Sequence, residues 1–374
     1  MKQSLAGLPQ NEIETLLTES LPALRGELGY NIRAKQIYKW IARGVSGFEQ
    51  MTDIPALMQK QLQERFALYS SAVTSCHEDG DAKKIVITLN DGLKIEAVLL
   101  SDGKNRLTAC ISTQAGCPAR CVFCMTGSLK FKRNLSYGEI VEQYLHLRRI
   151  VNISGRDADA QKSQINFLPQ TGTNRHEHLI DNIVVMGMGE PLLNLGNLRK
   201  AADTLNDKAG LNFSRRRITV STCGICDGLF EIAKEPFVRL ALSLTTGDEE
   251  LRRELMPITK SNPLDKAHEA LKLFQDNNGG RVTLEIPLLG GINTRGKDAK
   301  SVAEFARGLD AVVNIIPWNP VNGFKFKGNL LREPEKKETT DFIKMLESYG
   351  LKTTMRLHKG QRIMGACGQL GSTD

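Results

Sequence analysis

The chain has 374 residues, of which 41% are apolar and 25% are charged. A chain of this length and composition can bury one large core and a small accessory domain, which excludes a disordered or fibrous protein. Fifty Lys and Arg against 42 Asp and Glu give a formal net charge of +8. That excess suits an anionic partner such as nucleic acid without requiring one.

The sequence contains no run of 18 apolar residues, and its start, from Met1 to Ala6, lacks the apolar region of a signal peptide. We therefore expect a cytoplasmic protein with no membrane contact. The eight cysteines are then expected to be reduced thiols, which favours metal binding or catalysis over structural disulfides.

Residues 1–75 are predicted to form a small helical accessory domain. Apolar side chains recur there at helical spacing with basic side chains between them, so its surface is expected to be basic. Residues 76–106 alternate around an Asp91-Gly92 turn, which predicts a β-hairpin extension leading into a third strand at 107–113.

Residues 107–374 alternate short apolar strands with amphipathic helices, which predicts an α/β fold whose parallel sheet closes fully or partly into a barrel. The expected strands are 183–186, 218–221, 240–244, 282–288, 312–316 and 353–357. The expected helices are 137–150, 198–209, 263–276, 302–309 and 337–349. The polar stretch at about 152–178 has no clear period and is expected to be an inserted surface loop.

A cysteine motif follows the third predicted strand. Cys117, Cys121 and Cys124 are spaced Cys-x3-Cys-x2-Cys, in the first loop of the barrel face where active sites collect. Three thiolates can hold three irons of a 4Fe-4S cluster, leaving the fourth iron for the amino and carboxylate groups of S-adenosylmethionine (SAM). The alternative is a zinc site, although zinc motifs usually pair two Cys-x2-Cys units. The motif therefore predicts a radical SAM enzyme.

The residues around this motif closely resemble the RlmN/Cfr family of radical SAM adenosine methyltransferases, and the RlmN branch is the closer match. The resemblance covers 114–127 and 131–135 and reaches segments near both ends, at 33–40 and 365–370. It implies a partial (β/α)6-type radical SAM barrel, one 4Fe-4S cluster and two SAM molecules per turnover. It also implies methylation of adenine carbon 2 in 23S rRNA and tRNA, with residues 1–75 as an RNA-binding domain. The enzyme is expected to be a monomer that receives electrons from an external donor such as a flavodoxin or ferredoxin system.

The resemblance assigns several residues to SAM binding. Gly189 and Glu190 follow an apolar strand, and Glu190 would accept a hydrogen bond from the SAM amino group. The other assigned contacts are Ser221, Ser243, Leu244, Thr245 and Asn319. Without the resemblance, each of these could be an ordinary strand-end turn residue. Thr245 stands where family members commonly carry histidine, so a role of that imidazole could not survive here.

Three further residues take catalytic roles only through the resemblance. Cys367 matches the cysteine that carries the methyl group, Cys110 matches the cysteine that resolves the covalent intermediate, and Glu96 matches the proposed proton acceptor. Taken alone, a buried cysteine is normally a small inert hydrophobe, and Glu96 would be a solvated strand residue. Cys223 and Cys226 form a Cys-x2-Cys pair without a second pair, and we interpret them as structural.

The implied chemistry is radical because carbon 2 of adenine is electron-poor and does not attack a methyl donor. One SAM methylates Cys367, and the 5′-deoxyadenosyl radical from a second SAM removes hydrogen from that methyl group. The carbon radical adds to the base, and Cys110 then attacks the Cys367 sulfur to release the product and leave a disulfide.

Three alternatives remain open. The same chemistry could act on carbon 8 of adenine, as in the Cfr branch. A radical SAM enzyme acting on protein or small molecules would make Cys110 and Cys367 incidental. A non-enzymatic iron-sulfur or zinc module would bind RNA without consuming SAM.

Overall fold

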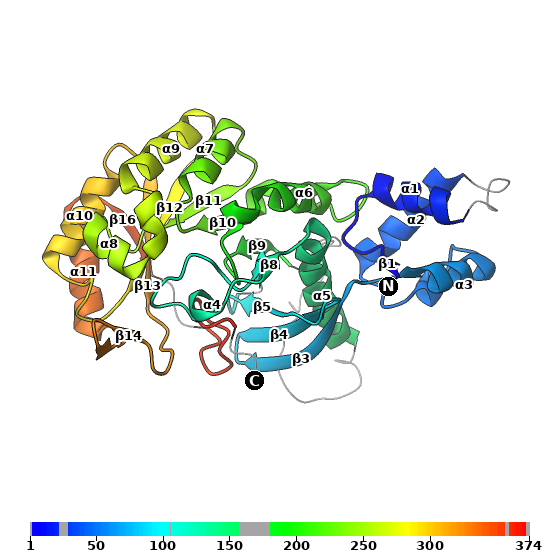
Figure 1. Ribbon diagram of the computed structural model, residues 1–374, viewed down its shortest axis with the longest axis horizontal. Helices are drawn as coiled ribbons and strands as arrows, with labels where there is room; N and C mark the ends of the chain where they lie inside the picture. Colours follow the sequence, from blue (N-terminus) through cyan, green and yellow to red (C-terminus); the bar gives the residue numbers. More distant parts are fainter. Residues whose placement is uncertain (1, 22–28, 105, 157–179, 356–358, 372–374) are drawn as a thin grey trace.

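The computed structural model describes residues 2–21, 29–104, 106–156, 180–355 and 359–371. Within these ranges a helical unit, a β-ribbon and a β/α sheet follow one another along the length of the molecule (Figure 1). In the described part of the chain, no helix is both long and apolar enough to cross a membrane.

The helical unit contains the N-terminal part of the chain. Its helices are α1 (Gln10–Ser20), α2 (Tyr30–Arg43) and α3 (Ala56–Arg65). Apolar side chains at helical spacing, among them Leu17, Ile37 and Leu62, are fully buried between these helices. Strand β1 (Gln3–Ser4) pairs in parallel with β2 (Phe66–Ala67), which brings the start of the unit beside its end.

An antiparallel ribbon follows, made of β3 (Ser71–Asp79), β4 (Ala82–Leu89) and β5 (Lys94–Ser101). Strands β4 and β5 form the predicted hairpin, and Gly92 supplies the positive φ of 81° that its tight turn needs. Strand β3 was not predicted from the sequence. Most of its side chains are exposed, so its sequence does not alternate between apolar and polar residues. The ribbon leads into β6 (Leu107–Cys110), which pairs with β5.

The ribbon and the parallel strands share one sheet, which has ten strands among the described residues, in the order β16-β13-β12-β11-β10-β9-β6-β5-β4-β3. After β6, the parallel strands are β9 (Asn182–Val185), β10 (Ile218–Thr222), β11 (Arg239–Ser243), β12 (Val282–Leu288), β13 (Ala311–Pro317) and β16 (Lys352–Met355). These six match the six strands predicted for this region. Because β16 is an edge strand, the barrel is open, which confirms the predicted partial β/α barrel.

The longer helices connect the parallel strands and lie on the outside of the curved sheet (Figure 1). They are α5 (Tyr137–Arg156), α6 (Leu195–Asn206), α7 (Cys226–Lys234), α9 (Leu264–Asp276), α10 (Gly296–Ala306) and α11 (Lys336–Ser348). Two short helices, α4 (Met125–Ser128) and α8 (Glu249–Leu255), follow the cysteine motif and β11. The five predicted helices are present, whereas the short α7 and α8 were not predicted. Helix α5 includes the first residues of the predicted loop at 152–178, and the rest of that loop lies outside the described residues.

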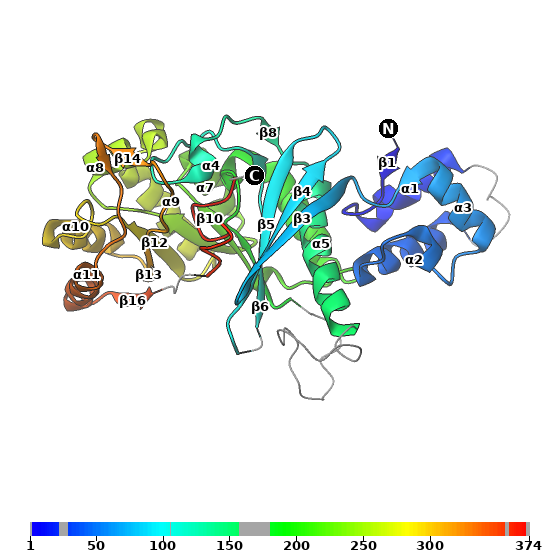
Figure 2. The same ribbon diagram turned by 90° about the horizontal axis from the view of Figure 1, so that it is seen from below.

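The C-terminal segment, residues 359–371, forms neither helix nor strand. It lies between the parallel part of the sheet and the ribbon (Figure 2). A short antiparallel ladder encloses the cysteine motif, since β7 (Gln114–Ala115) pairs with β8 (Arg133–Asn134). A backbone hydrogen bond from Met125 to Gly368 joins the C-terminal segment to this motif.

Candidate active site

The three motif cysteines face a cavity at the carboxyl ends of the parallel strands. Its volume is about 170 Å³, and Cys117, Cys121 and Cys124 line it together with residues that follow β9, β10, β11, β12 and β13. We name it the triad cavity. Parallel strands place their carboxyl ends at one edge, which is where β/α barrels build their active sites.

The triad loop is held against this edge by contacts from the far side of the barrel. The backbone N–H of Val122 donates to the carbonyl of Leu255 over 3.0 Å. The indole Nε1 of Trp318 donates to the carbonyl of Phe123 over 2.9 Å. The positions of the cysteines therefore depend on residues almost two hundred positions away.

Burial raises the pKa of all three triad thiols. The pKa of Cys117 rises to about 12, and those of Cys121 and Cys124 also lie above the usual thiol value. Within the described residues, no three or more His, Cys, Asp or Glu side chains converge as ligands of a single metal ion. A 4Fe-4S cluster makes a different demand, because each thiolate binds a separate iron. Three thiols that line one cavity fit that group.

Most of the predicted SAM contacts line the triad cavity, namely Gly189, Glu190, Ser221, Ser243 and Asn319. They follow different strands that lie in parallel register, so residues far apart in sequence meet at one edge. Leu244 and Thr245 do not line the cavity, since both are fully buried behind it.

Two glycines let the loop after β9 approach the triad. A Cβ on Gly187 would lie 2.5 Å from Ser112 Oγ, and one on Gly189 would lie 2.5 Å from Gln114 Cβ. Gly189 also has a positive φ of 103°, which side chains other than glycine rarely adopt. A larger residue at either position would push this loop away from the cysteines.

Glu190 is a buried carboxylate that organises the ends of two strands. Its Oε1 accepts from Leu192 N over 2.9 Å and from Thr222 Oγ1 over 2.6 Å, while its Oε2 accepts from Cys223 N over 2.7 Å. Burial raises its pKa, and these donors oppose that rise. An ionised carboxylate offers about four acceptor positions, so Oε2 can still accept one hydrogen bond from a ligand amine.

Glu285 is a cavity residue that the sequence analysis missed. It lies on β12 with 6% of its surface exposed, and its Oε2 accepts from Ser221 Oγ over 2.6 Å. The same hydroxyl lies 3.2 Å from Ser243 Oγ. A carboxylate inside the apolar strand 282–288 was the available signal, because buried charges are rare unless they are paired.

Thr245 supports the cavity from behind. Its φ of 67° lies in the left-handed region, which is strained for a β-branched residue. Its N–H donates to the carbonyl of Glu285 over 3.1 Å, and Asn293 Nδ2 donates to its carbonyl over 2.9 Å. Its hydroxyl lies 3.1 Å from the sulfur of Met256, a cavity residue. Threonine here shapes the backbone without reaching the ligand space.

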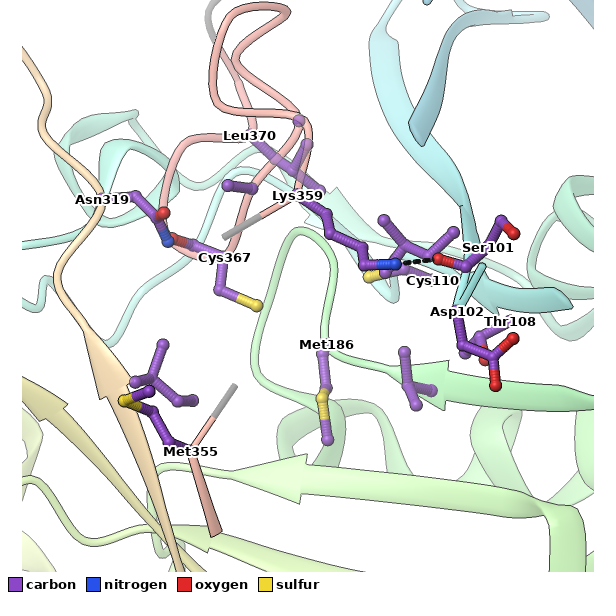
Figure 3. A pocket seen from close by; sticks show the side chains of 15 residues that line it. Ser101, Asp102, Thr108, Cys110, Met186, Asn319, Met355, Lys359, Cys367 and Leu370 are labelled. Atoms are coloured by element: carbon purple, nitrogen blue, oxygen red, sulfur yellow. Dashed lines mark hydrogen bonds between the residues drawn. The ribbon is translucent and has the colours of Figure 1, made fainter. Parts of the chain in front are cut away.

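A second cavity of about 370 Å³ adjoins the first, and Cys110 and Cys367 point into it (Figure 3). We name it the cysteine-pair cavity. Cys110 comes from β6, and Cys367 comes from the C-terminal segment. Four residues line both cavities, namely Met186, Ile316, Asn319 and Cys367, so the two spaces are neighbours and Cys367 belongs to both.

The segment that carries Cys367 is tied directly to the triad loop. The backbone N–H of Met125 donates to the carbonyl of Gly368 over 2.7 Å, and the hydroxyl of Thr126 donates to the carbonyl of Leu370 over 2.6 Å. Met125 and Thr126 immediately follow the last triad cysteine. The position of Cys367 is therefore coupled to the triad.

Glu96 lines neither cavity. It is fully buried on β5, which excludes a solvated strand residue. Its Oε1 accepts from Lys84 Nζ over 3.0 Å, and its Oε2 accepts from Gly371 N over 2.6 Å. Lys84 Nζ also lies 3.5 Å from the carbonyl of Met364. In this arrangement the Lys84–Glu96 pair anchors the segment on both sides of Cys367.

Comparisons with known proteins identify the family of the chain. Residues 111–305 match the Radical SAM superfamily, and residues 5–68 match the ribosomal RNA large subunit methyltransferase N-terminal domain. A protein of Treponema denticola named probable dual-specificity RNA methyltransferase RlmN is 45% identical over 100% of this chain and 96% of its own length. A protein of Thermus thermophilus with the same name is 37% identical over 95% of this chain and 91% of its own.

A solved structure supports the same assignment. The crystal structure of a radical SAM methyltransferase from Sphaerobacter thermophilus superimposes with a TM-score of 0.86 at 31% identity. It covers 98% of this chain and 99% of its own. The chain therefore belongs to the RlmN family of radical SAM RNA methyltransferases.

Proposed function

We propose that this chain methylates carbon 2 of adenosine in RNA through a methyl group carried on Cys367. The observation that carries this proposal is that Cys367 lines both cavities. The triad cysteines and the strand ends proposed to bind SAM line one of these cavities. Cys110 lines the other, whose volume of about 370 Å³ falls within the roughly 300–1,000 Å³ typical of small-ligand pockets.

Membership of the radical SAM superfamily implies a 4Fe-4S cluster and SAM. We assign the cluster to Cys117, Cys121 and Cys124, and the amino group of SAM to the remaining acceptor position of Glu190. When bound, the cluster supplies the electron that cleaves SAM to the 5′-deoxyadenosyl radical and can take back the electron that the adduct loses. We further propose two SAM molecules per turnover, a flavodoxin or ferredoxin system as donor, and a monomeric enzyme.

The two cysteines divide the remaining work. Cys367 Sγ loses its proton and takes the methyl group of the first SAM by displacement. After one hydrogen is removed, the carbon on Cys367 Sγ bonds to carbon 2 of the base, and the adduct then gives up the ring proton and one electron. Cys110 Sγ attacks Cys367 Sγ, the carbon–sulfur bond breaks, and the carbon takes a proton to become the product methyl group. Glu96 remains our candidate for the ring proton and would have to leave Gly371 to reach it.

We propose 23S rRNA and tRNA as the substrates. The relatives bear the name dual-specificity RNA methyltransferase, and the N-terminal family model is that of a ribosomal RNA methyltransferase. Helix α2 presents exposed Lys35, Lys39 and Arg43, and the Arg43 guanidinium lies 4.7 Å from the centre of the Trp40 ring. Such cations attract phosphates, while the target base must leave its stack to enter a cavity.

The test uses anaerobically reconstituted protein, reductant, unmodified 23S rRNA and SAM with a trideuterated methyl group. We expect the wild type to form 2-methyladenosine whose methyl group carries two deuterium atoms, because one deuterium passes to 5′-deoxyadenosine. Cys367→Ala should form no methylated base. The isomer and the deuterium content are read by mass spectrometry after digestion of the RNA.

Other results would move the assignment. A product methylated at carbon 8 would place the chain with the Cfr branch. Methylation by Cys367→Ala would overturn the methyl-cysteine route. Formation of 5′-deoxyadenosine without any RNA product, from 23S rRNA or from unmodified tRNA, would point to a different substrate.

A further inference from the structure

Arg252 is a buried cation that the proposed mechanism does not use. It lies on α8, with 1% of its surface exposed. Nε donates to the carbonyl of Leu244 over 2.9 Å, and Nη1 donates to Thr259 Oγ1 over 2.7 Å. Nη2 donates to the carbonyls of Cys223 and Ser243 over 2.6 and 3.2 Å. These acceptors are all neutral, which is unusual because buried charges are normally paired with an opposite charge.

The guanidinium is hydrogen-bonded to the backbone of two residues that line the triad cavity, Cys223 and Ser243. The carbonyls that it holds belong to the ends of β10 and β11, which carry the SAM-facing hydroxyls of Ser221 and Ser243. Three residues beyond it, Leu255 accepts the hydrogen bond from Val122 in the triad loop, and Met256 lines the cavity. Helix α8 therefore links the arginine to both halves of the site.

The electrostatic surroundings of Arg252 also connect it to the triad. Burial lowers the pKa of Arg252, and the sulfur groups of Cys223 and Cys121 are the strongest opposing influences. Cys121 is a triad residue, and Cys223 lines the same cavity. An anionic group held by the triad would thus lie within electrostatic reach of the guanidinium.

A cluster on three thiolates is such an anion. Its core with two positive charges and three thiolates carries one net negative charge, and reduction adds a second. A cation fixed in the interior favours the more negative state, because Coulomb interactions are screened less where water is excluded. Net charge and hydrogen bonding around a cluster are the means by which proteins set its reduction potential.

We propose that Arg252 acts as the buried counter-cation of the cluster, raising its reduction potential, and as a positioning residue that holds the strand ends that bind SAM. This inference rests on the assignment of the cluster to the triad and is independent of the RNA target. Arg252 then has two roles that can be separated by mutation. Its charge affects the reduction potential of the cluster, and its guanidinium N–H groups hold the backbone carbonyls at the strand ends.

The test compares Arg252→Gln, Arg252→Lys and the control Arg253→Gln in reconstituted protein without RNA. Arg253 neighbours Arg252 but is about half exposed and pairs with Glu249, so its loss should change neither readout. The reduced cluster is counted by electron paramagnetic resonance during a redox titration. For Arg252→Gln we expect the ratio of reduced to oxidised cluster at a set potential to fall about tenfold, which equals about 59 mV for a one-electron couple.

Arg252→Lys separates the two tasks. Lysine keeps the positive charge but lacks the several N–H donors of the guanidinium. We therefore expect the redox titration to match that of the wild type, while the affinity for SAM falls about tenfold. The role of the charge would be overturned if Arg252→Gln titrated like the wild type, or if the titration of Arg252→Lys shifted as far as that of Arg252→Gln. If Arg252→Gln does not fold, Arg252→Lys alone tests the charge, and a shifted titration in that variant would overturn the proposal. A wild type that binds no cluster would instead refute the proposed function.

Discussion

The triad cavity and the cysteine-pair cavity are neighbours that are built in different ways. The triad cavity combines one contiguous motif with the carboxyl ends of five parallel strands, and the backbone ladder of the sheet holds those ends. The cysteine-pair cavity is lined by residues of several strands, β6 among them, and is completed by a C-terminal segment without regular structure. Individual hydrogen bonds and one buried ion pair hold that segment in place.

This difference has a functional consequence. A lost contact in the triad cavity should remove the chemistry at its source, since cluster binding and SAM cleavage both take place there. A lost contact in the cysteine-pair cavity should leave SAM cleavage intact and interrupt a later step. Variants can therefore separate the two cavities by the step at which the reaction stops.

The largest effect is expected from Cys121→Ser. It removes one of three iron ligands, so we expect loss of the cluster absorbance and of SAM cleavage, measured as 5′-deoxyadenosine. The matched control is Cys76→Ser, because Cys76 is exposed on β3 and far from the motif in sequence. A fully active Cys121→Ser would contradict the assignment of the triad.

Cys110→Ser should stop the reaction later. We expect SAM cleavage to continue through the first turnover and a covalent protein–RNA adduct to accumulate, because no thiol is left to attack the Cys367 sulfur. The adduct is detected as a shifted band on a denaturing gel that ribonuclease removes. Released methyladenosine at the wild-type rate would show that Cys110 does not resolve the adduct.

Lys84→Met should loosen the Cys367 segment. It leaves the carboxylate of Glu96 buried without its cation, which typically costs about 3–5 kcal/mol of unfolding free energy. We expect faster amide exchange in residues 364–371, with the triad cavity intact. Lys94→Met is the control, since Lys94 is exposed on β5 and its loss should stay within about 0.5 kcal/mol. Unchanged exchange at Gly371 would contradict an anchoring role.

The smallest effect is expected from Thr126→Val. The change keeps the shape of the side chain but leaves the carbonyl of Leu370 without its donor, which costs roughly 1–3 kcal/mol. Denaturant titration measures this loss, and Thr126→Ser, which keeps the hydroxyl, should restore most of it. Equal stability of both variants would show that the contact does not hold the segment.

The sequence predicted the parallel strands well because each is a short apolar run between turn residues. It missed β3, whose side chains are mostly exposed, and the short helices α7 and α8, which show too few turns for a clear period. Because α8 was not predicted, Arg252 was not recognised as a buried residue. In the sequence it is simply one member of an Arg-Arg pair. Only its neighbour Arg253 behaves as an ordinary surface cation.

By itself, the sequence determined the cysteine motif, the alternation of strands and helices, and the resemblance that named Cys110 and Cys367. These are local properties, since spacing and periodicity are carried by adjacent residues. Only the tertiary structure decided that Cys367 stands between two cavities, that Glu96 pairs with Lys84 away from both, and that Glu285 faces the hydroxyl of Ser221. The physical reason is that such contacts join strand ends and a C-terminal segment that only the folded sheet brings to one edge.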